Sequence, residues 1–375
     1  MSMNKMFKKV LAVVAAGAMT MGMAMPTFAA DGAKMTEAWI TKTYNTEVGK
    51  AEKFSFTAEQ VKTGTGIITT DAPVTMPEIS FTDTETGTKS KRSQITFPAY
   101  PEAGKYEYTV TEKQTVDPAV VNGDHEKMIM SQAEYTMDVY VTDGAAGTEI
   151  SNIVVNKVKD DAGQTKTGKV DIGNTDTNSF NFTNTYVQEA GTGTKPTNPD
   201  PTYKDNGALK VSKTIDANGG TLDTEKAFDF TATFTFPKGT DESTLGGVKG
   251  NGADVSLTGG AYTFTLKHGD KMKFTGLPVG TKITVTETGA ANYKASASVV
   301  LDGATATTLA AGKYHADFTA VTDGRLGQKK NTVDVKNTYN YVPTTGIIMN
   351  TLPYVLMIAL CGAALFGFVA FKRRR

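Results

Sequence analysis

The chain has 375 residues, with 39 basic and 39 acidic side chains, one cysteine and three histidines. A single cysteine excludes a disulfide framework and a cysteine-based zinc site, and the histidines are too scattered along the sequence to predict a metal cluster. A net charge of zero argues against nucleic-acid binding. Long stretches in which β-branched residues alternate with polar ones indicate an all-β fold, and the length suits two domains.

Residues 1–30 have the pattern of a secretory signal peptide. Lysines at positions 5, 8 and 9 precede an apolar stretch, and small residues follow that allow cleavage after Ala29 or Ala30. An uncleaved membrane anchor is the alternative interpretation. The short apolar stretch and the clear cleavage site favour the signal peptide.

Between the two ends, the sequence predicts two β units joined by a linker. We expect domain one over 31–188, a proline-rich linker over 189–206 and domain two over 207–341. Proline at the density of this linker predicts a stiff, extended spacer. Each unit opens on a strand ending in Lys-Thr, continues with alternating phenylalanines and a YTVTE or ITVTE strand, and closes on Asn-Thr-Tyr. The units are therefore expected to be tandem copies of one β-sandwich.

Three strands in each domain carry a polar residue in line with apolar neighbours. Because side chains alternate between the two faces of a strand, these polar residues are predicted to point into the core. They are Lys42, Glu112 and Asn184 in domain one, and Lys213, Glu287 and Asn337 in domain two.

Burying an isolated charge costs many kcal/mol, so each set of three needs an explanation. One explanation is a buried Lys–Glu ion pair with a hydrogen bond from Asn. The other is chemical: burial lowers the pKa of a lysine and raises that of a glutamate, which favours a neutral amine beside a neutral acid. The amine can then attack the Asn carbonyl while Glu hydrogen-bonds the oxyanion and shuttles protons, leaving a Lys–Asn isopeptide bond and ammonia.

The C-terminus combines a short motif, an apolar segment and a basic tail. Residues 347–371 contain no charged side chain and are long enough to cross a bilayer as a helix, and the basic residues 372–375 are expected to stay on the cytoplasmic side. The motif before them consists of Val342, Pro343, Thr344, Thr345 and Gly346. Pro343 favours an extended conformation of the preceding residue, which suits presentation to an enzyme groove.

This three-part arrangement resembles the cell-wall sorting signal of Gram-positive surface proteins, with Val in place of the usual Leu. That variant is similar to the one in the shaft pilins of sortase-assembled pili. The resemblance implies that a sortase cysteine attacks the Thr345 carbonyl, releases the chain from Gly346 onward and passes the acyl group to an amine.

The two polar triads also resemble those of the isopeptide-bonded, immunoglobulin-like domains (collagen-adhesin B-type) of these pilins. The resemblance implies one Lys–Asn bond per domain, with Glu112 and Glu287 as the catalytic carboxyls. The stretch 283–293 is similar to the pilin E-box but lacks its Pro-any-Gly. A bond between the first and last strands carries tension past most of the domain, in a secreted chain with no cysteine pair.

A shaft subunit also needs an acceptor lysine for the acyl group of the next subunit. Lys204 resembles the one in the pilin Tyr-Pro-Lys-Asn motif, although the proline is missing. Lys166 and Lys169 match the position of the acceptor in the family, late in the first domain, and Lys195 in the linker is a further candidate. We rank Lys169 and Lys204 first.

Two functions share these features. The first is the backbone subunit of a covalent pilus, with sortase, copies of itself, peptidoglycan and tip or base pilins as partners. The second is a monomeric, peptidoglycan-anchored adhesin for a host ligand. An enzyme acting on a foreign substrate lacks a supporting motif, and no cofactor, metal or nucleic acid is expected. Without the seven basic residues at the two ends, segment 31–346 keeps 32 basic against 39 acidic residues, which suits a mildly acidic protein at the cell wall.

Overall fold

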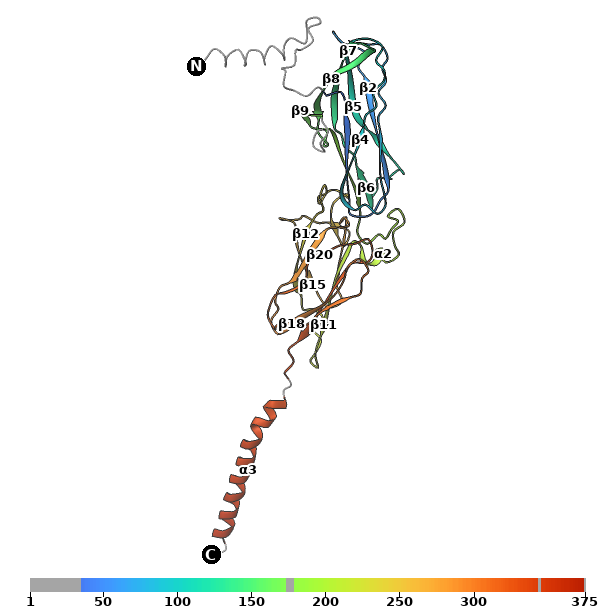
Figure 1. Cartoon of the computed structure of the whole chain (residues 1–375). Helices are drawn as coiled ribbons and strands as arrows, with labels where there is room; N and C mark the ends of the chain where they lie inside the picture. The colour runs from blue at the N-terminus through green and yellow to red at the C-terminus, as the bar shows by residue number, and fades with distance from the viewer. Residues whose placement is uncertain (1–34, 173–178, 343–344, 374–375) are drawn as a thin grey trace, which may run out of the picture.

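A computed structural model describes residues 35–172, 179–342 and 345–373. The predicted signal peptide, together with Pro343 and Thr344 of the sorting motif, lies outside these residues. The expected all-β class with two tandem β-sandwiches is confirmed: two sandwiches lie end to end, and one long helix extends beyond the second (Figure 1).

The first sandwich packs a four-stranded sheet, in the order β4-β1-β10-β6, against a six-stranded sheet, in the order β3-β2-β5-β7-β8-β9. Its strands are β1 (Trp39–Thr46), β2 (Glu52–Gln60), β3 (Glu78–Phe81), β4 (Gly87–Gln94), β5 (Gly104–Asp117), β6 (Glu126–Ile129), β7 (Glu134–Gly144), β8 (Gly147–Lys159), β9 (Thr165–Val170) and β10 (Phe180–Gln188).

The second sandwich packs a seven-stranded sheet, in the order β14-β13-β16-β11-β21-β18-β19, against a four-stranded sheet, in the order β15-β12-β17-β20. Its strands are β11 (Leu209–Asp216), β12 (Phe228–Thr235), β13 (Lys249–Gly250), β14 (Ala253–Asp254), β15 (Ala261–Leu266), β16 (Lys271–Thr275), β17 (Lys282–Glu287), β18 (Tyr293–Val300), β19 (Thr307–Leu309), β20 (Phe318–Arg325) and β21 (Thr332–Tyr339).

In both domains the first and last strands pair in parallel, β1 with β10 and β11 with β21. The inward residues of these strands are apolar and buried, among them Ile40, Phe182, Val211 and Val335. Burial of alternate apolar side chains from both sheets is what holds the layers together. Lys42, Asn184, Lys213 and Asn337 are buried among them, and Glu112 and Glu287 are buried on the facing sheets.

The segment between the domains is not the extended spacer that its prolines predict. Its first residues join domain two: the amides of Ala190 and Gly191 donate to the carbonyls of Leu277 and Gly327. The chain then turns back, since the amide of Asp200 donates to the carbonyl of Thr192, and ends in the short helix α2 (Tyr203–Asn206). Backbone hydrogen bonds to domain two outweigh the stiffness of the prolines here.

The domains also touch through side chains. Glu47 of domain one pairs with Arg325 of domain two, and the Nε2 amide of Gln328 donates to Oε1 of Gln188. Gly280 has φ +89°, and a Cβ there would lie 2.6 Å from Cγ of Glu47. Only glycine therefore suits this close approach of the two domains.

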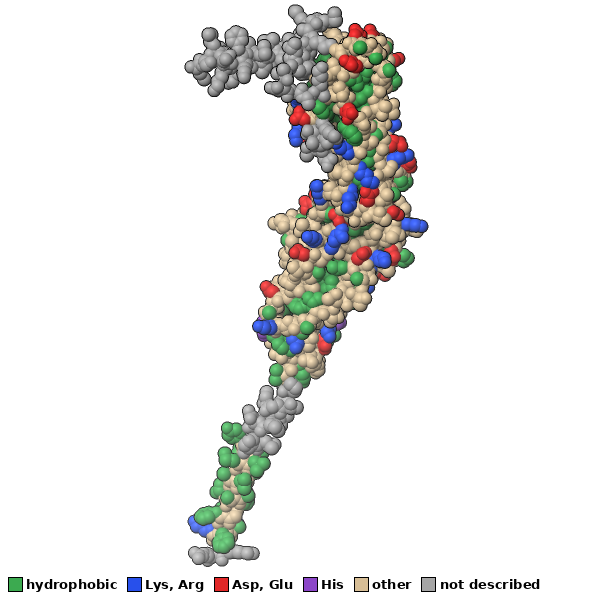
Figure 2. All heavy atoms as spheres, in the orientation of Figure 1, with side chains coloured by type: hydrophobic (Ala, Val, Ile, Leu, Met, Phe, Trp, Pro, Cys, Tyr) green, Lys and Arg blue, Asp and Glu red, His purple; other side chains and the backbone are tan. Residues whose placement is uncertain are grey.

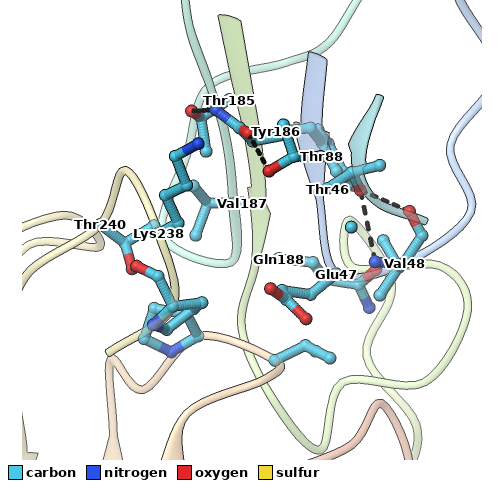
Figure 3. A pocket seen from close by; sticks show the side chains of 15 residues that line it. Thr46, Glu47, Val48, Thr88, Thr185, Tyr186, Val187, Gln188, Lys238 and Thr240 are labelled. Carbon is cyan, nitrogen blue, oxygen red and sulfur yellow. Dashed lines mark hydrogen bonds between the residues drawn. The ribbon is translucent and has the colours of Figure 1, made fainter. Parts of the chain in front are cut away.

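A small hollow remains at this junction (Figure 3). Its lining includes Thr46, Glu47 and Thr185 from domain one, and Lys238 and Thr240 from domain two. None of the six predicted triad residues lines it. We therefore treat it as part of the domain junction.

The helix α3 (Thr345–Lys372) is the C-terminal element. Its segment Tyr354–Lys372 is long and apolar enough to cross a membrane, and its side chains are exposed. Figure 2 shows mostly apolar side chains over the coloured part of this helix, whereas charged side chains of both signs are scattered over the two sandwiches. The composition is compatible with the expected membrane anchor.

Candidate functional site

The three polar residues of domain one meet in its core. The amine of Lys42 on β1 lies 2.7 Å from Oε1 and 2.9 Å from Oε2 of Glu112 on β5. The Nδ2 amide of Asn184 on β10 donates to Oε1 of Glu112 at 2.9 Å. Lys42 and Asn184 are 0% exposed and Glu112 is 3% exposed. One carboxyl therefore contacts both the amine and the side-chain amide.

Burial shifts the protonation of this group toward neutral forms. Desolvation lowers the pKa of Lys42 to about 8, against the opposing effect of the Glu112 carboxylate. Desolvation also raises the pKa of Glu112, although the lysine opposes it. The ring of Phe54, whose centroid is 4.4 Å from the amine, contributes to the apolar surroundings. A neutral amine beside a neutral acid is therefore more accessible here than in water.

Domain two repeats the arrangement. The amine of Lys213 on β11 donates to Oε2 of Glu287 on β17 at 2.6 Å, and Nδ2 of Asn337 on β21 donates to Oε1 of the same carboxyl. All three residues are buried, and desolvation lowers the pKa of Lys213 to about 8. The ring of Phe228 lies 4.0 Å from the amine. The sequence repeat thus extends to side-chain geometry.

The strand register explains why the two sites match. On the parallel strands β1 and β10, Asn184 lies opposite Tyr44, two residues beyond Lys42. On β11 and β21, Asn337 lies opposite Ile215, again two residues beyond its lysine. An offset of two keeps both side chains on one face, within reach of each other.

The glutamates approach from the facing sheets at equivalent places. Glu112 lies opposite Phe56 on β2, and Glu287 lies opposite Phe230 on β12. In each domain this is the second phenylalanine of the alternating pair that marks the sequence repeat. The triad therefore spans the sandwich, with Lys and Asn in one sheet and Glu in the other.

The orientation of the Asn amide differs from the expectation that Glu contacts the carbonyl oxygen. In both domains the carboxyl accepts a hydrogen bond from Nδ2. In domain one, Oδ1 of Asn184 instead accepts from the backbone amide of Ser131 at 2.7 Å. In domain two, Oδ1 of Asn337 has no hydrogen-bond partner among the described residues.

Sequence reasoning missed two groups beside the first triad, Ser131 and Asp161. The hydroxyl of Ser131 donates to Oδ1 of Asp161 at 2.5 Å, and the carboxylate of Asp161 acts electrostatically on both Lys42 and Glu112. Both residues lie in connections between strands, outside any strand alternation, so their sequence positions carried no signal of this role.

A further buried carboxyl, Glu52 on β2, was also missed. It is 2% exposed, neither oxygen has a hydrogen-bond partner among the described residues, and the amine of Lys50 lies 3.9 Å from Oε1. Desolvation raises its pKa to about 7, with Glu126 and Asp117 adding to the shift. Glu52 lies at the start of β2, and the alternation of that strand could have revealed it.

The candidate acceptor lysines are all exposed but lie in different elements. Lys166 and Lys169 lie on the edge strand β9, and Lys204 lies in α2. Lys195 lies in the folded connection between the domains. In the sorting motif, Val342 is 73% exposed, and α3 begins at Thr345. The predicted Thr345–Gly346 cleavage bond therefore lies at the start of the helix.

Sequence comparisons relate both domains to known families. Residues 38–187 match the family described as the Spy0128-like isopeptide containing domain. The first domain belongs to this family. Residues 207–339 match a family described only as a domain of unknown function. Among the described residues of either domain, no group of three or more His, Cys, Asp or Glu side chains is placed to hold a metal.

One curated relative and several solved structures belong to pili. The pilus tip adhesin Cpa of Streptococcus pyogenes is 36% identical over 89 residues, which are 24% of this chain and 12% of that protein. The major pilin of Streptococcus pyogenes is 18% identical, covering 81% of this chain and 98% of that one with a TM-score of 0.33. Its T-13 form is 21% identical, covering 82% and 98%, also with a TM-score of 0.33.

Proposed function

We propose that this chain is the backbone subunit of a covalent cell-surface pilus, with one Lys–Asn isopeptide bond in each domain. The observation that carries the proposal is the pair of matching buried triads. A merely structural ion pair needs no asparagine at a fixed offset, whereas bond formation needs the amine, the carboxyl and the amide together. The isopeptide-containing family of the first domain supports the same chemistry.

The geometry suggests the following reaction in each domain. The neutral lysine amine attacks Cγ of the asparagine, and the electrons of the C=O bond move to Oδ1. The carboxyl takes a proton from the attacking nitrogen and delivers one to Nδ2, which it already contacts. The C–Nδ2 bond breaks and ammonia leaves. Because the product is a neutral amide, the cost of burying charge disappears.

The mass of the protein tests this chemistry directly. After removal of the signal peptide, the intact chain should weigh less than its sequence mass by two molecules of ammonia. Digestion should yield one peptide joining Lys42 to Asn184 and another joining Lys213 to Asn337. An unshifted mass would reduce both triads to buried ion pairs.

Assembly by sortase at Thr345 is the second part of the proposal. The exposed Val342, the apolar helix α3 and the tandem rod-like domains all suit a subunit joined end to end. Cell-wall extracts on a denaturing gel should show a ladder of multimers that disappears in Thr345→Ala.

A peptidoglycan-anchored adhesin is the second candidate function. The local match to a pilus tip adhesin is the observation that favours it. An adhesin attached singly to the wall would give one band on the same gel. The gel therefore separates the two candidates, whatever the state of the isopeptide bonds.

A further inference from the structure

The two triads differ at the oxygen that would become negatively charged. Oδ1 of Asn184 accepts a hydrogen bond from the amide of Ser131, whereas Oδ1 of Asn337 has no partner among the described residues. The contacts of the carboxyl with the amine and with Nδ2, and the strand offset, are alike in the two triads. This difference bears on the step in which charge develops on Oδ1.

Strand pairing explains the difference. In domain two, β18 pairs with β21 without interruption from Tyr293 to Val300, so the backbone beside Asn337 belongs to a regular ladder. In domain one, β6 leaves β10 after the pair of Ile129 with Thr185. Beyond this break the chain is free of the ladder, and the amide of Ser131 turns to the Asn184 side chain.

Hydrogen bonds at its hydroxyl and its carbonyl hold Ser131 in this orientation. Its hydroxyl donates to Asp161, its Oγ accepts from the amide of Ala133 at 3.2 Å, and its carbonyl accepts from Nε2 of Gln114 at 2.9 Å. Asp161 is itself held, because Oδ1 also accepts from the amide of Thr183 at 2.9 Å. Ser131 is 1% exposed, so water does not compete with its amide. A buried donor fixed before the reaction stabilises developing charge without reorganisation.

We infer that the backbone amide of Ser131 is the oxyanion donor for isopeptide formation in domain one, that Asp161 positions it, and that domain two reacts without an equivalent donor. The inference rests on the proposed Lys–Asn chemistry. In the attack of Lys42 on Asn184, the Ser131 amide stabilises the charge on Oδ1, while Glu112 moves the proton to Nδ2. Ammonia then leaves and the carbonyl re-forms.

The prediction is a difference in rate between the two domains of one chain. Removing an oxyanion donor slows reactions by about 10²–10³-fold. The full chain is made in a short pulse of cell-free synthesis with lipid vesicles, chased, quenched in acid and digested. Mass spectrometry then follows the Lys42–Asn184 and Lys213–Asn337 peptides over time. We expect the domain-one peptide to form first, and an equal or faster domain-two reaction overturns the inference.

Variants test Ser131 itself. Ser131→Pro removes the amide hydrogen and should slow only the domain-one bond, by about 10²-fold. Gln132→Pro is the matched control, since it removes a neighbouring amide hydrogen that donates to the Asp161 carbonyl and not to Asn184. Asp161→Ala should slow domain one less than Ser131→Pro, because the amide remains but is held less firmly.

The outcomes distinguish the inference from the proposed function. If Ser131→Pro forms the domain-one bond at the wild-type rate, the Ser131 assignment is wrong while the isopeptide chemistry stands. If Ser131→Pro fails to fold, the comparison of the two domains in the wild-type chain decides. If neither cross-linked peptide appears in the wild type, both the proposed function and the inference fail.

Discussion

Asn184 lies on β10 two residues beyond the position opposite Lys42 on the parallel strand β1, and both side chains contact the Glu112 carboxyl from the facing sheet. This relationship joins the first and last strands of the domain at one buried point. A bond there closes nearly the whole domain into a covalent loop. The same geometry at Lys213 and Asn337 makes each domain an independent test of the chemistry.

Replacing one catalytic carboxyl should abolish one bond only. Glu112→Gln keeps the size of the side chain, but the amide cannot take the proton from the lysine amine. The intact mass of this variant should therefore be lower than its sequence mass by one ammonia instead of two. Loss of a cross-link that closes a loop of this length costs roughly 4–5 kcal/mol in the chain-entropy account. Differential scanning calorimetry should show a lower Tm for domain one alone. Glu287→Gln is the matched control, with the effects confined to domain two.

Asparagine and lysine variants separate the bond from the ion pair. Asn184→Ala removes the bond but keeps the contact of Lys42 with Glu112, whereas Lys42→Met removes both. Because Lys42→Met leaves Glu112 buried and unpaired, its unfolding free energy should be about 3–5 kcal/mol lower than that of Asn184→Ala. Urea unfolding should therefore rank domain-one stability as wild type, then Asn184→Ala, then Lys42→Met. If Asn184→Ala unfolds at the wild-type urea concentration, the wild type holds no bond.

Glu52 predicts a pH dependence of stability in domain one. Its folded pKa is raised from 4.5 to about 7, so the folded state binds the proton more tightly than the unfolded state. The contribution of Glu52 to stability should therefore be greatest below pH 4.5, fall as the pH rises toward 7 and stay lower above it. Glu52→Gln should remove this contribution and make the domain more stable than the wild type at pH 8.

Two further measurements make the Glu52 prediction specific. At pH 4, wild type and Glu52→Gln should unfold at nearly the same urea concentration. Glu78→Gln is the control, because its carboxyl lies at an exposed position on the neighbouring strand β3. A difference in stability between wild type and Glu52→Gln that shrinks between pH 5 and 7 would contradict the assignment.

His125 predicts a pH dependence of the junction between the domains. Its Nδ1 lies 2.5 Å from Oε2 of Glu189, a residue 1% exposed whose Oε1 accepts from the amide of Gly276 in domain two. The hydrogen bond between His125 and Glu189 raises the pKa of His125 above 6.5, with a smaller contribution from Asp124. The stabilisation is therefore fully present below pH 6.5 and is lost as the pH rises through the folded value.

The measurement compares His125→Gln with the wild type across this range. The difference in unfolding free energy should be largest below pH 6.5 and shrink at higher pH. His315→Asn, at an exposed position with φ 65° away from the junction, is the control. A difference that grows with pH would mean that His125 acts in its neutral form.

The acceptor lysine should be found among the four exposed candidates, of which Lys169 and Lys204 rank first. Changing the acceptor to arginine keeps the charge but removes the nucleophilic amine, so the multimer ladder should collapse to a monomer. The isopeptide mass deficit should persist, because the triads are untouched. Each single variant, Lys166→Arg, Lys169→Arg, Lys195→Arg and Lys204→Arg, serves as a control for the others. A ladder that survives all four would place the acceptor elsewhere.

Local sequence patterns predict which side chains enter the core. Alternation along a strand depends only on local backbone geometry, so it placed Lys42, Glu112 and Asn184 on inward faces before any pairing was known. The strand motifs that repeat in the second unit predict the same placement for Lys213, Glu287 and Asn337 in domain two. The length and composition of the C-terminal segment likewise predicted the apolar helix.

How these faces meet depends on contacts between strands that are distant in the chain. The two-residue offset between Lys42 and Asn184 depends on strand register. The amide of Ser131 can donate to the Asn184 side chain because β6 leaves β10 before this residue. The folded connection after Gln188 depends on backbone hydrogen bonds to domain two, which outweigh the local preference of its prolines. Each of these features is a contact between residues far apart in the chain, and local propensity does not specify such contacts.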